Sequence, residues 1–285
     1  MAMVSRVACF LTCGYTEAGA MQFFLRKIND SYEYKQYLPN KTIKKKGDAK
    51  RINPKISGLT GDALLEKIYT ILEKHKDEIN TCKAVLIEDD LDGRFHNWDN
   101  KKIKGYRDAI VDKVHSKLES DIPVFILYAS PEAESWFIAD WDNGFGYLYG
   151  KSNRIKDMDQ KAKSFFLHHL RDYIYSEVLK EYSHDIEDYG WFENGYIKLS
   201  DQIISVVQTD IKDYVRKLHK ANLDCVKQIR ESRDLYYSKK LHGDIMLRNI
   251  YPGVVAKNAE SILWVHIMNW LILVIIMYEM VALQS

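Results

Sequence analysis

The stretch Ala84-Val85-Leu86-Ile87-Glu88-Asp89-Asp90-Leu91-Asp92-Gly93 decides the fold class that we expect for this chain. Four apolar residues lead directly into an acidic turn, a pattern typical of a buried strand that carries carboxylates at its carboxyl end. Two other apolar runs end similarly, Val7–Leu11 before Thr16-Glu17 and Val124–Leu127 before Glu132-Ala133-Glu134. Open α/β sheets build their sites at this edge, so we expect the three acidic clusters to meet there.

Helical patterns separate these strands along the chain. Helical spacing covers Ala18–Ile28, a strongly amphipathic helix follows Gly61, and Lys104–Leu118 is also helical in pattern. Tyr32–Leu38 is expected as a further short strand. The alternation of strand and helix predicts an α/β fold with a central, mostly parallel sheet, flanked by helices and joined by right-handed crossovers.

The second half of the chain has a different pattern, mainly helical and rich in tyrosine. Three of its segments have helical spacing: Met158–Leu179, Leu199–Leu218 and Ala221–Tyr236. We therefore expect a core over residues 1–142, a helical appendage over 143–260 that completes the domain, and an apolar C-terminal helix over 261–285.

Composition narrows the class of protein. The chain has 285 residues, 46% of them hydrophobic and 28% charged, which is enough to bury a substantial core. A formal net charge of +1 provides no global field toward nucleic acid, so any attraction must be local. The four cysteines have no metal-ligand spacing, and Met1–Leu11 lacks the pattern of a signal peptide. We expect a reducing, cytoplasmic setting.

The C-terminal stretch Ile262–Leu283 is almost entirely apolar, interrupted by His266, Asn269 and Glu279. At about 1.5 Å per residue, such a helix is long enough to cross a hydrocarbon core of roughly 30 Å. A terminal helix buried against the sheet or a partner has the same composition. The scattered polar residues and the lack of a basic cluster after Leu283 favour the buried helix over membrane association.

The acidic turn itself predicts a metal site. Asp90 and Asp92 stand at i and i+2, so in an extended chain both point the same way and can ligate one cation, while Gly93 lets the chain leave sharply. Clustered carboxylates repel one another unless they are protonated or bridged by a cation. Oxygen ligands without a Cys or His cluster favour Mg²⁺ or Mn²⁺ over zinc. An acidic surface turn is the alternative interpretation.

Glu17 and Glu134 extend this set by position, since each follows a predicted strand. Either could instead complement the dipole at the start of a helix. Of Glu132 and Glu134, we expect only one to face the metal. Divalent cations held by carboxylates typically serve phosphoryl chemistry. The sequence has no Walker-type glycine loop, no Gly-X-Ser-X-Gly elbow and no convincing Cys–His pair.

A basic segment, Lys41–Lys55, is the candidate nucleic-acid contact. Several cations on one segment give a salt-dependent attraction to phosphates that is independent of sequence. A solvated turn is the alternative. The candidate phosphate-binding residues are Lys44, Lys45, Lys46, Lys50 and Arg51.

Three motifs in order resemble those of a known family: Gly14-Tyr15-Thr16-Glu17, Asp90-Leu91-Asp92-Gly93 and Pro131–Asp140. They are similar to the toprim-like family that contains the second component of the AbiL abortive-infection system and is related to the RloB and OLD-type nucleases. Tyr237–Gly243 resembles that family's C-terminal pattern. The resemblance runs from Val4 to about Leu263.

The resemblance implies a toprim fold and a Mg²⁺-dependent (or Mn²⁺-dependent) nuclease that cuts DNA or RNA, tRNA included. It further implies a toxic effector in antiphage defence, controlled by an ABC-type ATPase partner. By this match Glu17 is an acid/base or metal ligand, Asp90 and Asp92 are the metal pair, and Glu134 is a further ligand. The match also suggests support for Glu134 from Asp140, and Lys239 or Lys240 stabilising charge on the phosphate.

Two other function classes remain as alternatives. One is a non-catalytic regulatory subunit that binds the ATPase through the tyrosine-rich region Tyr173–Tyr237, since interfaces are enriched in Tyr and Trp. The other is a membrane-inserting effector that acts through Ile262–Leu283.

Overall fold

A computed structural model of the chain describes residues 5–12, 14–39, 59–95, 98–129, 132–150, 171, 198–201, 203–205 and 237–258. Within these ranges, a four-stranded, all-parallel sheet is flanked by helices. The expected α/β fold with a parallel sheet is therefore confirmed. The described elements after the last strand are all helical.

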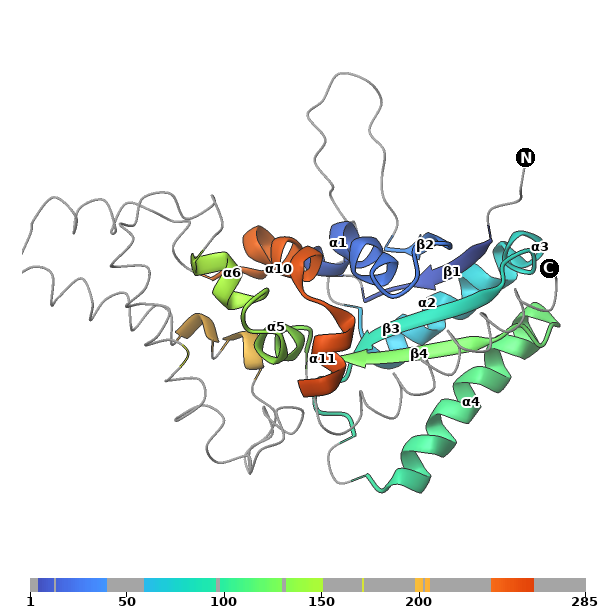
Figure 1. Cartoon of the computed structure of the whole chain (residues 1–285). Coiled ribbons are helices and arrows are strands. Elements are labelled where there is room, and N and C mark those ends of the chain that lie inside the picture. Colours follow the sequence, from blue (N-terminus) through green and yellow to red (C-terminus); the bar gives the residue numbers. More distant parts are fainter. Residues whose placement is uncertain are drawn as a thin grey trace, which may run out of the picture.

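The strands are β1 (Arg6–Phe10), β2 (Glu33–Leu38), β3 (Ala84–Asp90) and β4 (Val124–Ala129). They lie in the order β2-β1-β3-β4. Connections run in opposite directions on either side of the β1/β3 pair, so a topological switch point lies there, the place where open α/β sheets bind ligands. The carboxyl ends of the strands point toward α5 and α11 (Figure 1).

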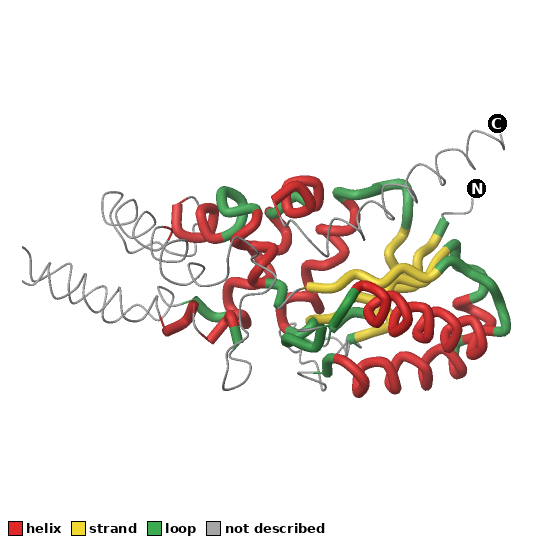
Figure 2. The backbone as a smooth tube through the Cα atoms, turned by 90° about the horizontal axis from the view of Figure 1, so that it is seen from below, coloured by secondary structure: helices red, strands yellow, loops and turns green. Residues whose placement is uncertain are grey.

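One face of the sheet is covered by α2 (Gly61–Lys74), α3 (Lys76–Ile79) and α4 (Asn100–Leu118). In α2 the predicted apolar face is confirmed, because Leu64, Leu65, Ile68, Ile71 and Leu72 are all buried. Figure 2 shows long helices running alongside the strands. Alternate residues of the strands, among them Phe10 and Ile87, pack against these helices.

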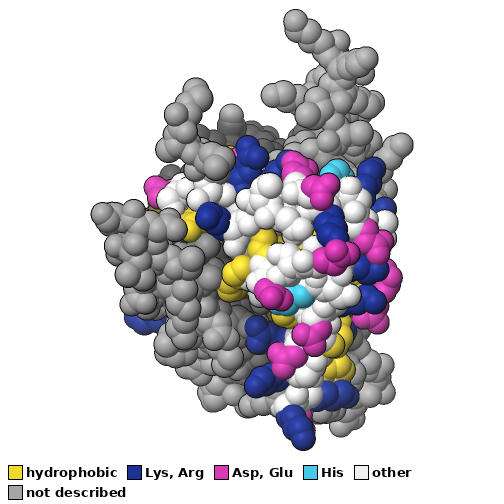
Figure 3. Space-filling view, turned by 90° about the vertical axis from the view of Figure 1, so that its right-hand side faces the viewer, with side chains coloured by type: hydrophobic (Ala, Val, Ile, Leu, Met, Phe, Trp, Pro, Cys, Tyr) yellow, Lys and Arg dark blue, Asp and Glu magenta, His cyan; other side chains and the backbone are white. Residues whose placement is uncertain are grey.

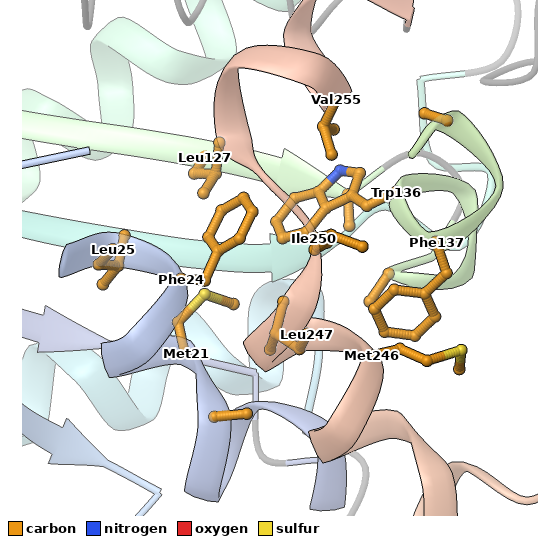
Figure 4. Close-up of a cluster of buried hydrophobic side chains, with 14 of the residues drawn as sticks. Met21, Phe24, Leu25, Leu127, Trp136, Phe137, Met246, Leu247, Ile250 and Val255 are labelled. Atoms are coloured by element: carbon orange, nitrogen blue, oxygen red, sulfur yellow. The ribbon is translucent and has the colours of Figure 1, made fainter. Parts of the chain in front are cut away.

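The opposite face is covered by α1 (Tyr15–Arg26), α5 (Glu134–Ala139), α6 (Phe145–Gly150), α10 (Asp244–Asn249) and α11 (Pro252–Asn258). Figure 4 shows side chains of α1, α5, α10 and α11 meeting in one cluster, with Phe24 of α1 next to Trp136 of α5. These two rings stack with centroids 5.3 Å apart. Residues 244–258 therefore share a hydrophobic core with the first strand and helix of the chain.

Polar contacts fasten α10 to α1. Lys27 donates hydrogen bonds to the carbonyl oxygens of Arg248, Asn249 and Ile250 at 2.6, 2.8 and 2.8 Å. A cation at these carbonyls also suits the negative end of the α10 dipole. In return, Arg248 donates to the carbonyl of Gly19 at 2.6 Å. The short π-helix η4 (Lys239–Gly243), which precedes α10 directly, is held beside α1 by these contacts.

The amino-terminal edge of the sheet carries charges of both signs. Arg6 pairs with Glu33 at 2.7 Å, and Lys76 pairs with Glu119 at 2.7 Å. Figure 3, which views the molecule from this side, shows basic and acidic side chains intermixed. Pairs this exposed contribute little to stability, about 0–1 kcal/mol each.

Several predicted features lie outside the described residues. These are the basic segment with Lys44, Lys45, Lys46, Lys50 and Arg51, the apolar stretch Ile262–Leu283, and nearly all of the three tyrosine-rich helices. Of the latter, residues 199–201 and 203–205 are helical. Among the described helices, none has both the length and the apolar character needed to cross a membrane.

Candidate functional site

Strand β3 runs three residues further than its apolar run, through Glu88 and Asp89 to Asp90. Successive side chains of a strand point to opposite faces. Glu88 and Asp90 therefore lie on the face covered by α1, and Asp89 lies on the face covered by α2. All three carboxylates are buried.

Asp89 has a structural role on its own face. Its carboxylate accepts the backbone N–H of Gly61 at 3.1 Å and pairs with Arg94 at 2.5 Å. Gly61, the first residue of α2, has a φ of 59°, a conformation that glycine adopts without strain. Asp89 therefore ties the start of α2 to the end of β3.

Glu88 and Asp90 are connected through Thr12, just after β1. The backbone N–H of Thr12 donates to Oε2 of Glu88 at 2.9 Å, and the hydroxyl of Thr12 accepts the backbone N–H of Asp90 at 3.2 Å. The other carboxylate oxygen of Glu88, Oε1, is buried and has no hydrogen-bond partner among the described residues. Burial, and next the charge of Glu17, raise the pKa of Glu88 well above its ordinary value.

Glu17 is delivered by the first turn of α1. Its carboxylate folds back over Gly14, because a Cβ built at Gly14 would collide with Oε2 of Glu17 and lie 3.2 Å from its Cδ. Gly14 therefore leaves space for this side chain at the helix start. Burial raises the pKa of Glu17 to about 7, against the lowering effects of its own backbone N–H and of Lys239.

Glu132 and Glu134 bind a common lysine. The Lys239 ammonium lies 2.5 Å from Oε2 of Glu132 and 3.1 Å from Oε2 of Glu134. Ser200 donates a hydrogen bond to Glu132 at 2.8 Å, and the Tyr237 hydroxyl donates to Oε1 of Glu134. Both glutamates are buried and both contact Lys239, and that only one of them faces a metal stays a prediction.

These groups lie close enough for the charge of one to shift the pKa of another. Burial raises the pKa of Asp90 well above its ordinary value, with Lys239 lowering it and Glu17 raising it further. Burial also raises the pKa of Glu134, and Lys239 opposes the rise. Burial lowers the pKa of Lys239, but Glu134, Asp90 and Glu132 outweigh it and raise that pKa above the ordinary value. We call the following residues the acidic cluster: Glu17, Glu88, Asp90, Glu132 and Glu134.

Asp92 lies beside this cluster rather than in line with Asp90. It follows the end of β3 with a φ of 48°, so the extended geometry assumed for an i, i+2 pair stops before it. Its carboxylate accepts a hydrogen bond from Thr60 at 3.1 Å and lies 3.6 Å from the ammonium of Lys198. In strand β3, the i, i+2 pair on one face is instead Glu88 and Asp90.

In the contacts that the structure gives, Asp140 accepts hydrogen bonds from Tyr251 and Asn143, not from a residue that supports Glu134. It accepts the backbone N–H of Tyr251 at 2.7 Å and the side-chain amide of Asn143 at 2.9 Å. These bonds connect the end of α5 to the start of α11. Lys240, the other predicted phosphate contact, is exposed on η4, whereas its neighbour Lys239 reaches the acidic cluster.

The structure thus brings four predicted residues together, Glu17, Asp90, Glu134 and Lys239. Sequence reasoning did not select Glu88, Glu132, Ser200 or Tyr237. Glu88 lies on the same face as Asp90 because β3 continues through the acidic residues, which the apolar pattern did not indicate. Ser200 and Tyr237 had no local signal, because their role depends on tertiary packing.

The acidic cluster suits a divalent cation in its donor chemistry. Five carboxylates gather around the Lys239 ammonium, so further protons or cations are needed to balance their negative charge. Hard oxygen donors are those that Mg²⁺ and Mn²⁺ prefer, and the buried Oε1 of Glu88 has an unfilled acceptor. As positioned, however, no three Asp, Glu, His or Cys side chains in the described ranges form a ready-made metal site.

Comparisons with known proteins add no family assignment. Neither the protein-family models, nor the curated proteins, nor the solved structures include a match to this chain.

Proposed function

We propose that this chain is a toprim-like, Mg²⁺-dependent nuclease that hydrolyses phosphodiester bonds in DNA or RNA. In this proposal it is the toxic effector of an antiphage abortive-infection system and is controlled by an ABC-type ATPase. The observation that carries the proposal is the convergence of the acidic cluster with Lys239 at the carboxyl edge of a parallel sheet. The motif resemblance supports the toprim assignment and the biological role.

The proposal assigns Glu88, Asp90 and Glu134 as carboxylates that hold Mg²⁺, and Glu17 as the acid/base. Bound Mg²⁺ would neutralise non-bridging phosphate oxygens and lower the pKa of a coordinated water. Glu17, with a pKa near 7, is suited to accept or return a proton at neutral pH. Lys239 is suited to stabilise negative charge on the phosphate, because its pKa keeps it protonated.

The test uses the purified full-length chain with supercoiled plasmid and tRNA as substrates, in the presence of Mg²⁺ or EDTA. Glu17→Gln and Asp90→Asn should each slow cleavage by at least about 10²-fold, the scale of a lost acid–base or charge-stabilising group. Glu73→Gln is the matched control, because Glu73 is an exposed carboxylate of α2 that pairs with Lys117. Wild-type cleavage rates in both site variants, or full activity in EDTA, would contradict the proposal.

A second candidate is a non-catalytic subunit that binds the ATPase. The contact of Lys239 with Glu132 and Glu134 favours it, since an internal ammonium can neutralise part of the acidic cluster without metal. This candidate predicts no cleavage by the wild-type chain under any metal condition, together with a stable complex when the chain is co-expressed with the ATPase.

A further inference from the structure

Among the described residues, Lys239 is a cation in direct contact with the acidic cluster. Its ammonium contacts Glu132 and Glu134, and its charge affects the pKa values of Glu17 and Asp90. A divalent ion bound by these carboxylates would therefore meet a positive charge already in contact with them. Two cations held by the same oxygens repel each other strongly at this range.

We propose that Lys239 is the built-in counter-cation of the metal-free acidic cluster and that an entering divalent cation displaces its ammonium from Glu132 and Glu134. The inference rests on the proposed function, because it requires the cluster to bind metal. It adds a regulatory property to the same site. Metal binding is opposed by Lys239, and the bound state releases the Lys239 ammonium from Glu132 and Glu134.

The local structure allows the side chain to move while the backbone stays in place. Lys239 is the first residue of the π-helix η4, and its flexible side chain is 35% exposed. The residues around it are fixed: Tyr237 donates a hydrogen bond to Glu134, and Gly243 packs directly on Thr16 of α1. The proposal therefore requires rotation of the Lys239 side chain and no rearrangement of η4. Single-turn π-helices occur frequently at functional sites.

Competition between Lys239 and the metal predicts the direction in which a substitution of Lys239 changes the affinity for metal. In Lys239→Met the competing charge is absent, so the acidic cluster should bind a divalent cation more tightly than in the wild type. If Lys239 instead held the carboxylates in place for the metal, the same substitution would weaken binding. The two roles therefore predict opposite changes.

The experiment measures Mn²⁺ binding to the full-length chain by calorimetry and by electron paramagnetic resonance at fixed pH and ionic strength. Lys239→Met should bind Mn²⁺ at least about tenfold more tightly than the wild type, since close charge pairs are commonly coupled by this much or more. Lys239→Arg keeps the charge, and Lys240→Met removes an adjacent exposed one. Lys240→Met should remain within about threefold of the wild type, the usual scale for changes to exposed charges. Lys239→Arg should bind Mn²⁺ less tightly than Lys239→Met, because it retains the competing charge.

A second readout uses the wild-type chain alone, so it does not depend on folding of the variant. Reductive methylation followed by mass spectrometry should show that Mn²⁺ accelerates labelling of Lys239 relative to Lys240, because the displaced amine becomes accessible. Equal or weaker Mn²⁺ binding by Lys239→Met, with unchanged labelling of Lys239, would overturn the inference and leave the metal site intact. Absence of Mn²⁺ binding in every variant, wild type included, would overturn the inference and the proposed metal site together.

Discussion

The backbone N–H of Thr12 binds Oε2 of Glu88 at 2.9 Å, and Oε1 of the same carboxylate is buried without a hydrogen-bond partner in the part of the chain that the structure describes. A buried polar atom without a partner is costly in a folded protein. A bound cation would give Oε1 a partner, and protonation would remove the buried charge, so both would favour Glu88 in this position.

Glu88→Gln should separate folding from metal binding. In the metal-free protein the raised pKa of Glu88 favours its neutral form, which glutamine resembles in shape and charge. We expect the free energy of unfolding to change by less than about 1 kcal/mol. Mn²⁺ affinity should fall at least about tenfold, because a charged oxygen ligand is lost. Urea unfolding in EDTA and calorimetry with Mn²⁺ measure the two effects, and loss of both in parallel would refute this account.

Stability of the metal-free protein should decrease with rising pH. The folded-state pKa of Glu17 is raised from 4.5 to about 7 by burial, so the folded state holds this proton more tightly than the unfolded state does. The contribution of Glu17 is therefore complete below pH 4.5 and is lost as the pH rises to about 7. Urea unfolding in EDTA, repeated across this pH range, measures how steeply the free energy of unfolding falls with pH.

Glu17→Gln provides the control for this pH dependence. Glu88, Asp90 and Glu134 have pKa values shifted in the same direction, so a part of the slope should remain in the variant. A slope identical to that of the wild type would show that Glu17 titrates at its ordinary pKa in the folded state.

Gly243→Ala should displace the segment that carries Lys239. A Cβ at Gly243 would collide with Oγ1 of Thr16 and lie 3.1 and 3.2 Å from its Cβ and Cγ2. Overpacking of this kind costs about 1–3 kcal/mol. Thr16→Ala should recover part of the loss in the double variant, since contacting sites are not additive.

The matched control is Gly105→Ala in the middle of α4, where a Cβ meets nothing within 4 Å. Replacing a helical glycine in open space should stabilise the protein by about 0.5–1 kcal/mol. If Gly243→Ala had the same effect as Gly105→Ala in thermal unfolding, close packing of η4 on α1 would be disproved.

Asp89→Asn should destabilise the fold without removing a carboxylate from the acidic cluster. Asp89 accepts the N–H of Gly61 and pairs with Arg94 on the α2 face, so its loss leaves a largely buried guanidinium without its partner. Breaking a buried pair on one side costs about 3–5 kcal/mol. Glu33→Gln, which breaks the exposed pair with Arg6, should cost less than about 1 kcal/mol. Equal midpoints for the two variants in urea would contradict the structural role of Asp89.

The fold was readable from the sequence because each strand is an apolar run and α2 has a clear apolar stripe. Hydrophobic periodicity reports which residues are buried, and parallel pairing follows from the alternation of strand and helix. The helices α6, α10 and α11 lie within the range 143–260 that was predicted to be helical, but they were not predicted individually. They have six or seven residues each, fewer than two turns, so their sequences contain no repeat from which a helix can be inferred.

The site could be predicted where a carboxylate ends a strand or begins the helix that follows one, as for Asp90, Glu17 and Glu134. The pairing of Asp90 with Asp92 assumed that the extended chain continues, but the positive φ of Asp92 ends it. Hydrophobicity could not show that β3 extends through three acidic residues, because charged residues normally mark the end of a buried strand. The approach of Lys239 to Glu132 depends on packing of α10 against α1, which no local pattern encodes.

Synthesis on the ribosome imposes an order on the assembly of this site. Lys239 stands 107 residues after Glu132. At about 5–20 residues per second, the ribosome therefore exposes the strands and their carboxylates roughly 5–20 s before the lysine that pairs with them. A nascent chain lacks both Lys239 and the packing of α10 during this interval. The set of contacts around Glu132 is therefore complete only after residue 239 has been synthesised and α10 has packed against α1.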